Sequence, residues 1–215
     1  MRGHGASGVK GQIDYVGQLE SDVVSFVQAV RPAAPSTLLG FSAGGGFVLR
    51  FAGSKDQALF QSYLLLSPFI NEDAPNQKPA DGDWVKVGVP RIMGLIVLHA
   101  LGVHAFNYLP VTRFALDEAS RKFLTPEYGF NLAHNFRPQR DYAANMQAVR
   151  QPCAVLAGTE DEVFATDRLE PMVRSAGLDW SVQLLPGVGH IPLTLEPDAI
   201  AATVSMVRTL QNVAR

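Results

Sequence analysis

A serine flanked by glycines marks the place where this sequence could carry a nucleophile. Ser42 lies in the stretch GFSAGGG, residues 40–46, directly after the apolar run TLLG. A serine hydroxyl is a poor nucleophile until a neighbouring base takes its proton, so Ser42 would need partners elsewhere in the chain. A sharp strand-to-helix turn would hold it at a strained position and tolerate only small neighbours, which Gly40, Ala43 and Gly44 are.

A base and an acid for Ser42 lie late in the chain. His190 follows the predicted strand WSVQLL in the loop PGVGHIPL. The loop AGTEDEVF, after the preceding predicted strand, holds three carboxylates, Glu160, Asp161 and Glu162. All these groups fall at carboxyl ends of predicted strands, where open α/β sheets place ligands. Ser42, His190 and one of the acids could therefore form a triad, and the spacing alone leaves open which acid orients the histidine.

Helices and apolar strands alternate on both sides of a long middle region. The pattern predicts helices over 14–30, capped by Asp14, then over 47–52, stopped by Gly53, and over 167–176 and 197–213. It predicts strands over 36–41, 62–67, 153–158 and 180–185. Continuous apolar strands between helices indicate an α/β fold whose parallel sheet is covered on both faces. We expect residues 1–67 and 151–215 to build this core, with 68–150 inserted as a helical cap or lid.

The middle region, residues 68–150, is rich in aromatic side chains and is either a helical layer with its own core or a cap that walls an apolar pocket. We expect the substrate to contact Phe41, Phe69, Trp84, Phe106 and Tyr108. The apolar stretch 92–103 is too short to cross a bilayer of about 30 Å. It predicts a buried or cap helix, or a surface that makes transient contact with lipid.

Composition narrows the classes of partner. With a formal net charge of −2 and no run of basic residues, nothing favours nucleic acid, and a small molecule is the expected ligand. Cys153 is the only cysteine, which predicts a buried thiol and favours a reducing, cytoplasmic location. No spacing suggests a metal site and no cofactor is implied. The other histidines are interpreted as structural: His4, His99, His104 and His134.

Four motifs in order, RGHGAS, GFSAGG, GTEDEVF and PGVGH, together resemble those of the α/β-hydrolase fold. Within that fold the chain is similar to the serine aminopeptidase and lysophospholipase-like group, which includes monoacylglycerol lipases. The resemblance implies that Ser42 is the nucleophile, His190 the base and Asp161 the acid, with Glu162 as second choice. It also implies that the backbone N–H of Ala43 donates to the oxyanion.

Two features depart from the family pattern. Phe41 stands where many relatives have histidine. The difference alters packing under the elbow, the strand-to-helix turn that carries Ser42, and removes no catalytic group. In the family, RGHG follows the fourth strand, and the preceding segment supplies a second oxyanion donor. We therefore expect Met1 to be an internal methionine of a longer hydrolase, the elbow strand to be an unpaired apolar edge, and the 215-residue chain alone to be poorly soluble or inactive.

The resulting hypothesis is a serine hydrolase that cleaves a carboxylic ester with an apolar or lipid-like acyl group through an acyl-enzyme on Ser42. Two enzymatic alternatives use the same triad, an aminopeptidase-like amide hydrolase and an acyltransferase. A third alternative is an inactive fragment or binding module. The sequence predicts neither the natural substrate nor the oligomeric state.

Overall fold

The computed structural model describes residues 1–78 and 85–214. The chain forms two compact units. One comprises Met1–Phe26 and Pro79–Asn135 and is called the first unit; the other comprises Val27–Lys78 and Phe136–Arg215 and is called the second unit.

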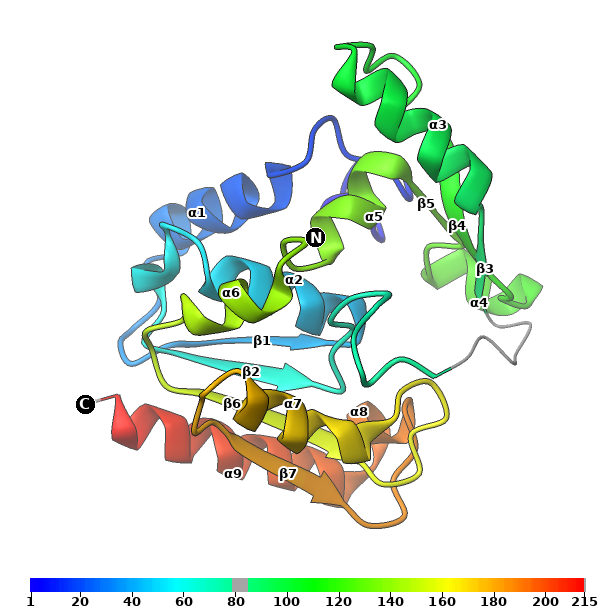
Figure 1. Ribbon diagram of the computed structural model, residues 1–215. Coiled ribbons are helices and arrows are strands. Elements are labelled where there is room, and N and C mark those ends of the chain that lie inside the picture. Colours follow the sequence, from blue (N-terminus) through cyan, green and yellow to red (C-terminus); the bar gives the residue numbers. More distant parts are fainter. Residues whose placement is uncertain (79–84, 215) are drawn as a thin grey trace. The chain divides into compact units, whose positions relative to one another are not determined.

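A four-stranded sheet forms the centre of the second unit (Figure 1). Its strands are β1 (Thr37–Phe41), β2 (Ser62–Leu66), β6 (Cys153–Gly158) and β7 (Ser181–Leu185), in the order β1-β2-β6-β7. Every pairing is parallel, which confirms the sheet type predicted from the apolar runs. The two inner strands are buried throughout, whereas β1 is an edge strand of the described sheet and Leu39 is 40% exposed.

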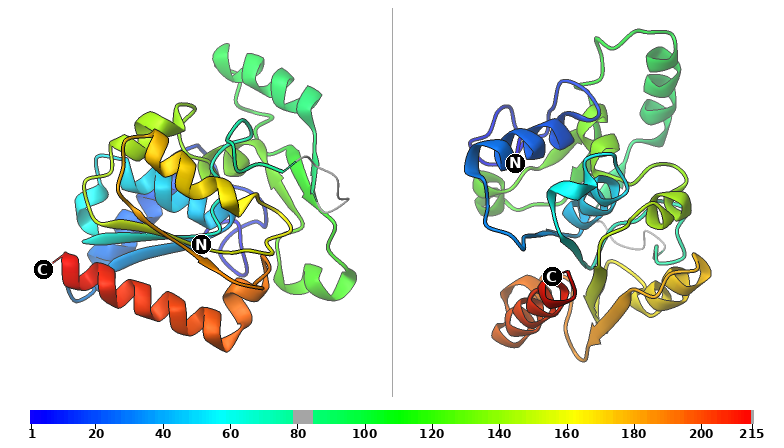
Figure 2. Two further views of the ribbon diagram at one scale, coloured as in Figure 1. Left: turned by 60° about the horizontal axis from the view of Figure 1, so that its bottom comes forward. Right: turned by 90° about the vertical axis from the view of Figure 1, so that its left-hand side faces the viewer.

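Helices cover both faces of this sheet (Figure 2). α2 (Ala43–Ala52), α6 (Tyr142–Gln147) and α7 (Leu169–Ser175) lie on one face. α9 (Pro197–Val213), preceded by the short α8 (Pro192–Leu195), lies on the other and packs on the inner strands. The buried cluster on that side consists of Leu64, Leu66, Ala154, Leu156, Val188, Leu193, Ala199, Met206 and Leu210.

Two predicted helices begin later than expected. α1 (Gln18–Val30) starts four residues after Asp14, so the predicted cap at Asp14 is wrong. Gly17 has φ 107°, outside the helical range, and its N–H donates to Asn135 Oδ1 at 2.7 Å instead. Likewise, α7 is preceded by the 3₁₀ turn η2 (Thr166–Arg168); a second such turn, η1 (Gln57–Leu59), precedes β2.

The first unit contains an antiparallel sheet that the sequence analysis missed. Its strands are β3 (Val85–Val87), β4 (Pro110–Phe114) and β5 (Glu127–Gly129). β3 and β5 have three residues each, too few to show alternation, and β4 is not a continuous apolar run because it carries Arg113. The helices of this part are α3 (Val89–Ala100), α4 (Glu118–Phe123) and α5 (Phe130–Phe136).

α3 contains most of the apolar stretch 92–103. Leu95 is buried against Val111 and Phe130, so one side of the helix packs on the first unit's own small core. Within the described part of the chain, no helix combines the length and the apolar character needed to traverse a membrane.

Candidate active site

Ser42 occupies a strained turn between β1 and α2. Its backbone angles are φ 54° and ψ −120°, a region that non-glycine residues rarely adopt. The turn is held by hydrogen bonds from the Ser42 N–H to the Leu66 carbonyl, 2.9 Å, and from the Phe69 N–H to the Ser42 carbonyl, 3.0 Å. Gly40 is required here because a Cβ at that position would overlap the Gly44 carbonyl oxygen. Gly44 is not crowded, because a Cβ there would meet no described atom within 4 Å.

His190 connects the serine to an acid. Its Nε2 lies 3.0 Å from Ser42 Oγ, and its Nδ1 lies 2.8 Å from Asp161 Oδ2. An ionised carboxylate only accepts hydrogen bonds, so Nδ1 carries the proton and Nε2 is left as an acceptor. The Ser42 hydroxyl therefore donates to a nitrogen that is able to take its proton. His190 is 4% exposed, so its ring is largely shielded from water.

The Asp161 carboxylate receives four donors although it is almost fully buried, at 1% exposed. Oδ2 accepts from His190 Nδ1 and from Ser67 Oγ. Oδ1 accepts from the backbone N–H groups of Val163 and Phe164, both at 2.8 Å. Burial raises the pKa of Asp161, but the hydrogen bonds from His190, Ser67 and Phe164 outweigh it and leave the pKa below its ordinary value. The carboxylate therefore stays ionised at neutral pH.

The neighbouring acids take other positions. Glu162 Oε2 accepts a hydrogen bond from the backbone N–H of His190 at 2.9 Å, so it holds the histidine loop rather than the imidazole. The Glu160 N–H donates to the Val188 carbonyl at 3.0 Å. Lys78 Nζ donates to the backbone carbonyl of Asp161 at 2.6 Å. Neither Glu162's contact with the loop nor the reach of Lys78 was predicted from the sequence.

Two aromatic rings contact the His190 imidazole. The Phe41 ring is tilted against it with centroids 4.6 Å apart, and the Phe164 ring meets it edge-on at 5.3 Å. These contacts fix the ring plane and shield it from water. Phe69 in turn contacts Phe164 at 6.4 Å. Sequence reasoning named Phe41 and Phe69 as substrate contacts and missed Phe164, which could have been noticed because it follows Asp161 by three residues.

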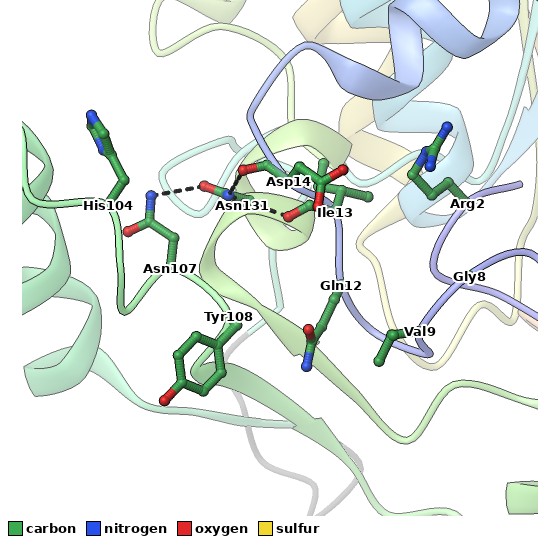
Figure 3. Close-up of a pocket in the computed structure, with 10 residues that line it drawn as sticks. All are labelled: Arg2, Gly8, Val9, Gln12, Ile13, Asp14, His104, Asn107, Tyr108 and Asn131. Atoms are coloured by element: carbon green, nitrogen blue, oxygen red, sulfur yellow. Dashed lines mark hydrogen bonds between the residues drawn. The ribbon is translucent and has the colours of Figure 1, made fainter.

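Three further residues were predicted to contact the substrate. Phe106 and Tyr108 are exposed residues of the first unit, and Trp84 lies outside the described residues. Tyr108 lines a cavity of about 360 Å³ within the first unit (Figure 3). The rest of its wall is mostly polar, with Val9 and Ile13 as apolar members: Arg2, Gly8, Val9, Gln12, Ile13, Asp14, His104, Asn107 and Asn131. The role of these three aromatics in binding substrate stays a prediction.

Ala43 is the first residue of α2, and amides in the first turn of a helix have no intrahelical acceptor. They add positive character beside Ser42, as the predicted oxyanion role requires.

Among the remaining histidines, His4 Nε2 lies 3.2 Å from Tyr128 Oη, and burial lowers the pKa of His4. No group of three potential metal-binding side chains comes together in residues 1–78 and 85–214.

Comparison with known proteins shows which family the sequence belongs to. The model of one protein family, described as serine aminopeptidase, S33, matches residues 1–198. The chain belongs to the serine aminopeptidase S33 family. This membership confirms the resemblance inferred from the four motifs, and it makes the protein a hydrolase with the α/β-hydrolase fold. No curated protein matches the sequence.

Solved structures share the fold of this S33 family member at low sequence identity. A monoacylglycerol lipase from Paleococcus ferrophilus matches with a TM-score of 0.66 and 16% identity, over 99% of this chain and 81% of that one. A thermophilic esterase from Thermogutta terrifontis matches with a TM-score of 0.65 and 18% identity, over 98% and 78%. A bromoperoxidase from Bacillus anthracis matches with a TM-score of 0.63 and 16% identity, over 97% and 79%.

Proposed function

We propose that this S33 family member hydrolyses carboxylic esters with apolar acyl groups through an acyl-enzyme on Ser42. The observation that supports the proposal most strongly is the unbroken hydrogen-bond path from Ser42 Oγ through His190 to Asp161, with distances of 3.0 and 2.8 Å. The strained serine at the start of a helix and the ionised, buried acid fit the same chemistry.

The proposed reaction proceeds in two halves. Ser42 Oγ attacks the ester carbonyl carbon while His190 Nε2 takes the hydroxyl proton, and the resulting oxyanion is stabilised by the N–H of Ala43 at the helix start. Collapse breaks the bond to the alkoxy group, which leaves as an alcohol with the proton from Nε2. Water then attacks the acyl-enzyme, gives its proton to Nε2, and releases the acid as Ser42 recovers its proton. Asp161 stays ionised and stabilises the imidazolium in both halves.

Hydrolysis of p-nitrophenyl esters by the wild type and by Ser42→Ala tests the proposal. In the full-length protein, we expect turnover by the wild type and loss of it in Ser42→Ala and His190→Ala, because each variant removes a reacting group. Wild-type turnover by Ser42→Ala would contradict the nucleophile assignment. Absence of turnover on any ester by a cooperatively folded wild type would favour the binding-module alternative.

The acyl preference is a second part of the proposal. Aromatic walls near the site would bury acyl methylenes at about 0.8 kcal/mol each, so butyrate and octanoate esters should give a higher kcat/KM than acetate. A preference for aminoacyl amides would instead favour an aminopeptidase. Transfer to an added alcohol faster than hydrolysis would favour an acyltransferase.

The exposed outer face of α3 is also consistent with a lipid-like substrate. Opposite the buried Leu95, this face presents Met93 and Val97, which are 57% and 58% exposed; Val89 and Ile96 are further exposed apolar residues of the helix, and Leu101 follows its last residue. A helix that is apolar on both sides is unusual at a water-exposed surface. We infer that α3 lies flat on the surface of a lipid bilayer, because its 12 residues are too few to span the bilayer.

Flotation with phosphatidylcholine vesicles tests this contact. We expect the wild type to bind and Val97→Glu to lose at least about ten-fold in partitioning, since the variant puts a charge where the valine methyl groups would contact lipid. Val204→Glu is the matched control, because Val204 is an exposed valine, 44% exposed, in the middle of α9. Equal binding of both variants, or a wild-type dimer that Val97→Glu dissociates, would contradict the lipid assignment.

A further inference from the structure

Ser67 lies beside the triad and takes no part in the proposed bond-making and bond-breaking steps. It directly follows β2, as Ser42 follows β1, and the loops after β6 and β7 carry Asp161 and His190. Its side chain is completely buried and its hydroxyl hydrogen-bonds to Asp161 Oδ2. An ionised carboxylate cannot donate, so Ser67 is the donor. Each strand of the second unit's sheet therefore places one polar side chain in the same buried network.

The backbone at Ser67 is held in an unfavourable conformation. Its φ is 39°, and the next residue is Pro68. A serine at positive φ carries a steric cost of order 1–3 kcal/mol that surrounding structure must offset. The Ser67 N–H donates to the Leu156 carbonyl at 2.8 Å, which keeps the residue tied to β6 as it turns toward Asp161. The turn thus aims a buried hydroxyl at the acid despite the cost.

We propose that Ser67 is a positioning residue that fixes the Asp161 carboxylate for its hydrogen bond with His190. This inference rests on the proposed function, since it assigns Asp161 the role of the acid. Oδ1 is held by two backbone N–H groups, whereas on Oδ2 the Ser67 hydroxyl is the second donor besides His190. Ser67 therefore sets which lone pair of Oδ2 is left for the imidazole and keeps the buried carboxylate ionised.

The rate at which a fluorophosphonate labels Ser42 measures this role without knowledge of the natural substrate. We expect Ser67→Ala to lower the second-order labelling rate by on the order of 10-fold to 100-fold, the loss that typically follows when a hydrogen bond to a metal-binding side chain is removed. Ser62→Ala is the matched control: Ser62 begins the same strand, is equally buried, and its hydroxyl bonds Thr37 Oγ1 at 2.7 Å. It should label at the wild-type rate.

A second variant separates the hydroxyl from the strained backbone. Ser67→Gly also removes the hydroxyl but accepts a positive φ without cost. Both Ser67 variants should label slowly while unfolding cooperatively, as followed by circular dichroism. A wild-type rate in Ser67→Gly would overturn the inference, because relief of strain, and not the hydroxyl, would then decide the rate.

A double-mutant cycle with Asp161→Asn tests whether Ser67 acts through the acid. If it does, Ser67→Ala should slow labelling further by less than about two-fold in the Asp161→Asn background, because the carboxylate it positions is already gone. A full additional loss in that background would show a structural role and overturn the inference. Failure to label the wild type would overturn the proposed function and this inference together, whereas normal wild-type labelling with an unchanged rate in Ser67→Ala would overturn this inference alone.

Discussion

Replacing Asp161 with asparagine should reverse the tautomer of His190. The carboxylate is 1% exposed and uses both oxygens, with Oδ1 toward the Val163 and Phe164 N–H groups and Oδ2 toward His190 and Ser67. The two backbone donors require the amide oxygen of an asparagine, so its NH₂ group must face the imidazole. Because an NH₂ group donates, Nδ1 becomes an acceptor and the proton moves to Nε2. That nitrogen then cannot take the proton of Ser42.

The expected loss is about 10⁴-fold in kcat, which corresponds to about 5.4 kcal/mol in the activation free energy. Steady-state hydrolysis of a p-nitrophenyl ester measures it. Glu162→Gln is the matched control, because Glu162 accepts from the His190 backbone N–H and a glutamine oxygen still can. We expect that variant to stay within about ten-fold of wild type. An Asp161→Asn enzyme with near wild-type kcat, or an equal loss in Glu162→Gln, would refute the assignment of the acid.

Three further predictions concern the elbow, the acid and the thiol. Gly40→Ala should cost at least about 2 kcal/mol in the free energy of unfolding, because its methyl group would overlap the Gly44 carbonyl, whereas Gly44→Ala should be tolerated; urea denaturation compares the two. Because the pKa of Asp161 is lowered in the folded state, its contribution to stability is present above the ordinary pKa of about 3.9 and is lost as pH falls further. The wild type should therefore lose more stability than Asp161→Asn between pH 5 and pH 3. Parallel curves of stability against pH for the two proteins would contradict this. Burial raises the pKa of Cys153, so the native thiol should resist iodoacetamide at about pH 8 and react once urea unfolds the chain.

The parallel sheet could be predicted because its signal is local. Apolar runs such as 153–158 predict buried strands directly, and β6 has the predicted bounds. The short strands around Lys86 and Arg113 carry charged residues and pair only through distant contacts, so the antiparallel sheet could not be inferred. The late start of α1 depends on the positive φ of Gly17, whose N–H bonds a residue more than a hundred positions away.

The candidate site could likewise be predicted only in part. Ser42, Asp161 and His190 could be named because each follows an apolar strand and the strands of a parallel sheet end at one edge. The supporting contacts of Ser67 and Lys78 are invisible in the sequence, because neither residue belongs to a periodic pattern and the partner of each, Asp161, is far along the chain. The choice of Asp161 over Glu162 likewise depended on the family pattern and not on the residues alone.

The mass of a covalent adduct on Ser42 tests the central claim most directly. After incubation of the wild-type protein with a fluorophosphonate, intact-mass spectrometry and peptide mapping should find one adduct per chain, located on Ser42. His190→Ala should show little labelling over the same time, since the serine would then lack its base. An unmodified Ser42 in a folded wild-type sample, or an adduct on another residue at an equal rate, would contradict the account.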